Sequence, residues 1–158
     1  MLTSFQFVTA QTGWGISTDQ PGPSFPFLFH TTNDGRSWMP VALPIPPTIT
    51  VPASTNPKLQ NYGVPVAPLV FATPKLGALW VTYYRWINPG YVNWAVLYIT
   101  TDGGGQWQAI LWHQLPNYPL QPPATIWPLS LHWQSTATGW MLQLQDHTGS
   151  VVKTFTIP

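Results

Sequence analysis

The sequence predicts an all-β protein built from repeated four-stranded antiparallel sheets, about three of them, the last incomplete. Three observations support this fold class. A turn-forming segment at Thr31–Trp38 returns at Thr100–Trp107, and three times an aromatic residue stands six positions before a glycine. The third observation is that 19 prolines are spread along the chain, and no window shows the 3.6-residue apolar period of a helix. A fixed internal repeat indicates that one structural unit recurs.

The repeated segment carries the residue types of a tight hairpin turn. Each copy reads Thr, then Asn or Asp two positions later, then Gly, and finally Trp. The residues are Thr31, Asn33, Gly35 and Trp38 in the first copy and Thr100, Asp102, Gly104 and Trp107 in the second. An Asn or Asp side chain accepts hydrogen bonds from the backbone just ahead of it, and Gly adopts a positive φ without strain. We therefore expect a hairpin in each copy, with the Trp packed beneath the turn.

The chain divides into three sheets within a single all-β domain, residues 1–158. The first sheet covers about residues 1–43, because four strand-forming runs alternate there with turn residues. Its strands are expected at Leu2–Val8, Trp14–Thr18, Phe25–Thr31 and Trp38–Leu43.

Residues 44–66 interrupt this rhythm with six prolines, which favour extended chain without backbone donors. The segment is too apolar for a solvated linker. We interpret it as an extended arm that lies on the surface of its own chain or of a neighbour. An ordinary long loop is the alternative, although loops of this length without a role are uncommon.

The second sheet covers about residues 67–112, and a second Pro-rich connector spans 113–128. A partial third sheet follows at 129–158, where neither a third copy of the turn nor a fourth strand can be found. The expected strands are Pro68–Thr73, Ala78–Arg85, Asn93–Thr100 and Trp107–Trp112 in the second sheet and Leu129–Gln134, Gly139–Gln145 and Ser150–Ile157 in the third.

The turn pattern [ST]-x-[DN]-x-G-x-x-W resembles the Asp-box, or BNR, repeat of β-propellers. In pattern the chain is most similar to the blades of photosystem II assembly factors and sortilin-type ectodomains, and sialidases share the box. The resemblance covers nearly the whole chain and implies β-propeller-type blades. Three blades are fewer than the roughly 4 to 8 that close a propeller. Either the chain belongs to something longer, or another chain completes it.

Composition excludes several classes of partner. The net charge is +1, from five basic and four acidic side chains. No basic stripe could neutralise phosphates, so we expect no nucleic acid. No apolar run approaches the ~20 residues of a membrane span, and the N-terminus lacks the pattern of a signal peptide. The nearly uncharged, Trp-rich and Pro-rich surface favours an extracellular or cell-envelope location.

The sequence does not predict an enzyme. The resemblance to sialidases would imply an arginine cluster and a Tyr/Glu nucleophile pair, yet the chain has only Arg36 and Arg85 and no Glu. Glycoside hydrolysis of the common kind needs two facing carboxylates, and the four Asp residues are scattered over separate loops and turns. The histidines show no metal-ligand spacing. We expect no catalytic residue, metal or cofactor.

Aromatic residues that the repeat does not explain gather at the end of one predicted hairpin. They form the candidate binding cluster Tyr83, Tyr84, Arg85, Trp86, Tyr91 and Trp94. Flat rings with polar tips suit sugar rings or a protein partner equally well. Alternatively, this hairpin simply packs on the Pro-rich arms.

Three functions follow from these observations. The first is a non-enzymatic structural or interaction protein of the cell exterior or envelope. It would assemble with other copies or a partner chain through open blade edges and Pro-rich arms. The second is a carbohydrate-binding module that uses the candidate binding cluster. The third is an assembly-factor-like binder of a membrane complex, which the resemblance implies.

Overall fold

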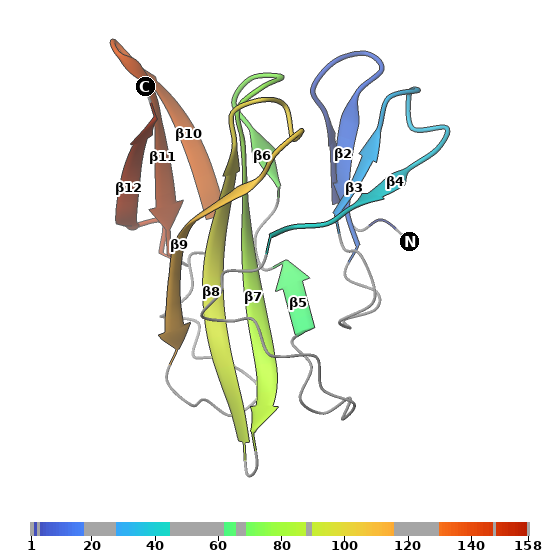
Figure 1. Cartoon of the computed structure of the whole chain (residues 1–158). Helices are drawn as coiled ribbons and strands as arrows, with labels where there is room; N and C mark the ends of the chain where they lie inside the picture. The colour runs from blue at the N-terminus through green and yellow to red at the C-terminus, as the bar shows by residue number, and fades with distance from the viewer. Residues whose placement is uncertain are drawn as a thin grey trace.

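The structure is a computed structural model that describes residues 2, 4–17, 28–44, 62–65, 69–87, 90–115, 130–146 and 148–157. At residues 62–65, 82, 84–87, 90–95 and 111–115 it describes the backbone alone. Twelve strands and no helix occur in the described residues, which confirms the all-β prediction. The strands form three antiparallel sheets that stand side by side, and none of them is closed into a barrel (Figure 1).

The first sheet is a meander of four short strands, as predicted. Its strands are β1 (Ser4–Phe7), β2 (Gly13–Ile16), β3 (Leu28–Thr31) and β4 (Met39–Val41), paired in that order. The repeated turn segment links β3 to β4. Trp14 stands opposite Gln6 on one side and His30 on the other. Because side chains alternate between the faces of a strand, Trp14, Ile16 and Leu28 share the face that packs on the central sheet.

The central sheet has the four predicted strands and one more. It contains β6 (Val70–Phe71), β7 (Gly77–Ile87), β8 (Gly90–Thr100) and β9 (Gln108–Leu115), together with β5 (Tyr62–Pro65). β5 pairs with β7 beyond the end of β6.

Two predicted boundaries of this sheet differ from the structure. The last residues of the expected arm, 62–65, are a hydrogen-bonded strand, because β7 is much longer than β6 and has backbone partners left at Val81–Tyr84. β9 also extends into the connector predicted at 113–128, where His113–Leu115 pair with β8. The remainder of both Pro-rich segments, apart from Pro44, lies outside the described residues.

The third sheet has three strands, β10 (Ser130–Thr136), β11 (Gly139–Gln145) and β12 (Val151–Ile157). No fourth strand equivalent to β4 or β9 occurs in the described part of this sheet, so β12 forms its edge. The prediction of an incomplete last blade agrees with this arrangement.

In the third sheet the aromatic residue of the aromatic-to-glycine repeat is not paired with the glycine. Phe7 stands opposite Gly13 and Phe71 opposite Gly77, whereas Trp133 stands opposite Leu142. A tight turn between Thr136 and Gly139 replaces the five-residue connections of the first two sheets. Because a shift of register by an odd number of residues exchanges the faces of a strand, Trp140 lies on the same face of the third sheet as Trp133. Both side chains pack on the central sheet.

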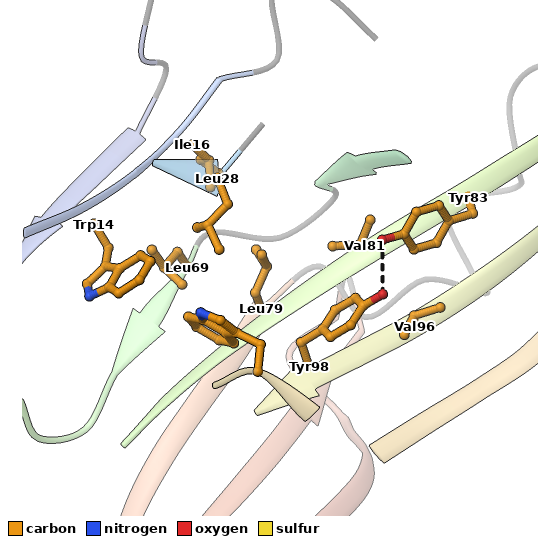
Figure 2. Close-up of a cluster of buried hydrophobic side chains, with 10 residues drawn as sticks. Trp14, Ile16, Leu28, Leu69, Leu79, Val81, Tyr83, Val96 and Tyr98 are labelled. Carbon is orange, nitrogen blue, oxygen red and sulfur yellow. Dashed lines mark hydrogen bonds between the residues drawn. The ribbon is translucent and has the colours of Figure 1, made fainter. Parts of the chain in front are cut away.

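The central sheet is covered on both faces, and this arrangement creates two separate cores. One core lies between the first and central sheets, as Figure 2 shows for Trp14, Ile16, Leu28, Leu79 and Val81. The other joins the central and third sheets. Its buried members are Leu76, Ala78, Trp80, Leu97, Ile99, Leu131, Leu142 and Leu144. The three sheets therefore form one stack with two outward-facing ends.

Candidate functional site

The first repeated turn is held together by two side chains. The hydroxyl of Thr31 donates to Asn33 Oδ1 at 3.0 Å and accepts the backbone N–H of Gly35 at 3.1 Å. Asn33 Oδ1 also accepts the backbone N–H of Ser37 at 3.0 Å. Gly35 has φ +79°, a conformation that side-chain-bearing residues rarely adopt. The bond from Ser37 to Asn33 and the positive φ of Gly35 are the features that the sequence pattern predicts, and the bonds of the Thr31 hydroxyl add to them.

The second turn repeats this network almost bond for bond. The Thr100 hydroxyl donates to Asp102 Oδ1 and accepts the backbone N–H of Gly104, both at 2.8 Å. Asp102 Oδ1 accepts the backbone N–H of Gln106 at 2.9 Å. That bond, followed by the one from Thr100, lowers the pKa of the Asp102 carboxyl below its ordinary value.

Each turn is also tied to the preceding hairpin of its own sheet. The backbone N–H of Asp34 donates to the carbonyl of Gln11 at 3.1 Å, and that of Gly103 donates to the carbonyl of Lys75 at 2.8 Å. The two acceptors occupy equivalent positions, two residues before Gly13 and Gly77. The repeat therefore extends beyond the turn to the whole sheet.

The tryptophans that close the two turns differ in their surroundings. Trp107 is buried, with 5% of its surface exposed, in the core between the first and central sheets. Its ring meets Phe71 edge to face, with 6.1 Å between centroids, and Trp14 from the first sheet meets it edge to face at 5.7 Å. Trp38 meets the equivalent Phe7 at 6.2 Å but is only half-buried.

The outward face of the first sheet carries exposed aromatic rings. Phe5 stands opposite Gly15, and Gly15 stands opposite Phe29, so these positions lie on the face away from Trp14 and the central sheet. Phe5 is 65% exposed and Phe7 is 40% exposed. Trp38 reaches this face too, because a Cβ added to Gly15 would lie 3.3 Å from its ring. We call Phe5, Phe7, Phe29 and Trp38 the outer aromatic face.

Sequence reasoning did not single out this outer aromatic face. The sequence predicts Trp38 beneath its turn, where it lies, and Phe7 as the first aromatic residue of the aromatic-to-glycine repeat, but it marks Phe5 and Phe29 only as strand formers. The one available signal was the spacing Phe5-x-Phe7, which in a strand places both rings on one face. The sequence alone could not tell which face of the first sheet would be covered.

The candidate binding cluster at the β7–β8 hairpin is not a single exposed patch of rings in this structure. Tyr83 is buried, with 3% of its surface exposed. Its hydroxyl lies 2.9 Å from that of Tyr98 (Figure 2). The Tyr98 hydroxyl donates to the carbonyl of Pro44 at 2.8 Å. Tyr83 is therefore the donor to Tyr98. The side chains of Tyr84, Arg85, Trp86, Tyr91 and Trp94 lie outside the described part of the structure.

The backbone register divides these six positions between both faces of the central sheet. Position 83 stands opposite 94, and position 84 stands opposite 93. Strand positions alternate between faces, so positions 83, 85 and 94 fall on one face and positions 84, 86 and 91 on the other. A site that uses all six residues together would have to form around the tip of the hairpin.

Ionisable groups are few in the cores. His30 stacks on Trp14 with 4.3 Å between ring centroids, and burial lowers the pKa of its imidazole. Among the described residues no three His, Asp or Glu side chains are grouped so that they could hold a metal ion. Asp146 Oδ1 accepts the backbone N–H groups of Thr148 and Ser150 and acts within its own turn. In the same described ranges, no helix has the length and apolarity needed to cross a membrane.

The described residues form three open antiparallel sheets of an all-β protein, and the first sheet presents the outer aromatic face. Comparisons of the chain with protein-family models, with curated proteins and with solved structures gave no match.

Proposed function

We propose that the chain is a non-enzymatic structural or interaction protein that assembles with other copies of itself or with a partner chain. The observation that carries this proposal is the outer aromatic face. Its rings, Phe5 and Phe7, are 65% and 40% exposed, whereas the equivalent face of the central sheet is buried beneath the first sheet. Exposed apolar surface of this kind marks interaction sites on soluble proteins.

The free edge of the third sheet supports the same proposal. β12 pairs only with β11 in the described residues, and Val151 and Val152 on it are exposed. An edge strand presents unpaired backbone groups, to which an extended segment of another chain can add. Two surfaces, an apolar face and a strand edge, are thus available for assembly.

We propose further that the two turns are Asp-boxes of propeller blades and that the protein works at the cell exterior or in the cell envelope. The first part is supported by the bonds of Thr31 with Asn33 and of Thr100 with Asp102, which repeat in both turns. The second is supported by the composition, with 6% charged residues, 19 prolines and 10 tryptophans.

Carbohydrate binding by the candidate binding cluster is the weaker candidate. It depends on several rings that are accessible together, and Tyr83 contributes its ring to the core between the first and central sheets. Binding of a membrane complex, the third function considered, has no feature among the described residues that favours it over assembly in general.

The native mass of the particle tests the proposed function. Light scattering on a sizing column, over a range of chain concentrations, should give a multiple of the 17.6 kDa chain mass. A mass of one chain at every concentration, with no complex formed in an extract of the source cells, would contradict the proposal.

A further inference from the structure

Three aromatic rings from two sheets form a closed group in the core. Phe71 and Trp107 of the central sheet meet edge to face with 6.1 Å between centroids. Trp14 of the first sheet stacks on Phe71 at 6.0 Å and meets Trp107 edge to face at 5.7 Å. Gly104 forms the floor of this group, because a Cβ added there would overlap the ring of Trp14. The central sheet thus offers a notch of Phe71, Trp107 and Gly104, and a ring from the adjoining sheet fills it.

The first sheet contains the same notch at the equivalent positions. Phe7 and Trp38 meet edge to face at 6.2 Å with an interplanar angle of 64°. Gly35 corresponds to Gly104, and a Cβ added to it would lie 3.3 Å from Phe7 and 3.6 Å from Trp38. No ring from another sheet joins this pair among the described residues. The notch of Phe7, Trp38 and Gly35 therefore has two of its three rings.

A ring suited to such a notch lies on the same face. Phe5 meets Phe7 edge to face at 6.2 Å and is 65% exposed, the most exposed large apolar side chain described. The outer aromatic face thus presents both a notch and a projecting ring. A surface that holds both halves of a contact can pair with its own copy across a two-fold axis, because each half then meets its counterpart.

We infer that the outer aromatic face binds the outer aromatic face of a second copy. The two copies are related by a two-fold axis, and Phe5 of each occupies the notch of Phe7, Trp38 and Gly35 in the other. This inference rests on the proposed function and specifies it, since it selects the face over the β12 edge and a closed pair over an open array.

The opposite end of the stack explains why the pair is closed rather than head-to-tail. The outward face of the third sheet carries Gln134, Gln143 and Gln145. Gln143 donates to Gln134 at 3.0 Å, and Gln145 donates to Gln143 at 3.5 Å. A head-to-tail stack of copies would press Phe5 and Phe7 against these amides, which would lose water without gaining partners. Pairing of like faces sets Phe5 and Phe7 against apolar rings, whereas the outward face of the third sheet mixes these amides with Met141 and Val151.

Charge does not oppose such a pair. No Asp, Lys or Arg occurs in β1, β2, β3 or β4. The nearest charged residues, Asp34 and Arg36, lie exposed in the turn at the rim and have opposite signs. The net charge of the chain is +1, so long-range repulsion between copies is small.

Two matched substitutions test the inference by sedimentation velocity over a concentration series. Phe5→Ser removes the projecting ring, and Val152→Ser removes an apolar side chain of similar exposure, 55%, from the β12 edge. Both residues are exposed, so neither change threatens the fold, and near-ultraviolet circular dichroism checks that. We expect the unaltered chain and the Val152→Ser chain to sediment as two-chain particles. Phe5→Ser should raise the dissociation constant of the pair roughly hundredfold, as the loss of a central aromatic anchor does.

The other outcomes overturn the inference in distinguishable ways. Assembly that survives Phe5→Ser but is lost in Val152→Ser would place the contact at the edge and leave the proposed function standing. An open polymer of the unaltered chain would exclude the closed pair but again not assembly. A single chain at every concentration for all three proteins would overturn the inference and self-assembly together.

Discussion

Trp14 in β2 packs its ring directly over Gly104 in the turn that follows β8, so a residue of the first sheet completes the core on one face of the central sheet. Trp14 is 1% exposed. The turn that the sequence repeats is therefore more than a local hairpin device. It also supplies the glycine that allows an aromatic ring from the adjoining sheet to approach the backbone.

Gly104→Ala should be among the more damaging single substitutions in the chain. The new methyl group would overlap the ring of Trp14, and φ at this position is +92°. Overpacking of a core and an unfavourable backbone conformation together cost about 2–4 kcal/mol of unfolding free energy. Chemical denaturation monitored by tryptophan fluorescence measures the change.

Gly149→Ala is the control for the steric part of that effect. Gly149 has φ +82°, but nothing lies within 4 Å of the position that a Cβ would occupy. The control should lose only the backbone contribution, about 1–2 kcal/mol. Equal losses in the two variants would show that Trp14 does not press on Gly104.

Asp102→Asn and Asp102→Ala should behave differently, because the first turn already has Asn33 in this place. Asn keeps the oxygen that accepts from Thr100 and Gln106, as Asn33 accepts from Thr31 and Ser37. Asp102→Asn should therefore unfold at nearly the same denaturant concentration as the unaltered chain. Asp102→Ala should lose about 1 kcal/mol for its missing hydrogen bonds. Identical losses in both variants would contradict this account of the turn.

The carboxyl of Asp102 also predicts a dependence of stability on acid. Its pKa is lowered in the fold, first by the N–H of Gln106 and then by Thr100, from an ordinary value of 3.8. Its contribution to stability is therefore complete above that value and is lost as the pH falls through the lower pKa of the folded state. Denaturation curves at several acid pH values should show this loss in the unaltered chain and a smaller one in Asp102→Asn. A loss of the same size in Asp102→Asn would assign the acid sensitivity to other groups.

Tyr83→Phe should change the response of the protein to alkali. Burial raises the pKa of Tyr83 from 10.0 to about 12 and raises that of Tyr98 as well. The folded state prefers the neutral phenol, so the contribution is complete below pH 10 and is lost as the pH rises from 10 through 12. The unaltered chain should lose roughly 2–3 kcal/mol over this window through Tyr83.

The Phe variant should lose less stability in alkali, since only Tyr98 still titrates in that core. At neutral pH it should be about 1 kcal/mol less stable, because the hydrogen bond from Tyr83 to Tyr98 is missing. Thermal unfolding in buffers between neutral pH and pH 12, followed by circular dichroism, tests both expectations. If the Phe variant lost stability over the same alkaline pH range and to the same extent as the unaltered chain, Tyr83 would not have the raised pKa argued here.

Much of the fold followed from local sequence signals. The spacing of Thr31, Asn33 and Gly35 specifies a turn chemistry that forms within a few residues, so the hairpin of β3 and β4 could be placed from it. β5 could not be predicted, because the pairing of Tyr62–Pro65 depends on how far β7 extends. That length results from cross-strand pairing of distant segments, which overrides the proline-rich local composition.

The candidate site was less predictable than the fold. Tyr83 was expected near a binding surface, but the pleat places it beside Tyr98 in the core. Phe5 looked like an ordinary strand former, and its exposure is decided by which face of the first sheet meets the central sheet. Burial of this kind follows from the stacking of sheets, and no single segment encodes it.

One distance measurement tests most directly whether copies meet at the outer aromatic face. The chain has no cysteine, so single labels can be attached through Thr32→Cys, beside the notch, or through Val152→Cys on β12. Both positions are exposed. Pulsed electron resonance between spin labels on two copies should give a short, narrow distance for position 32 and a clearly longer one for position 152. The reverse order, or no coupling at either position, would contradict the pairing of copies through the first sheet.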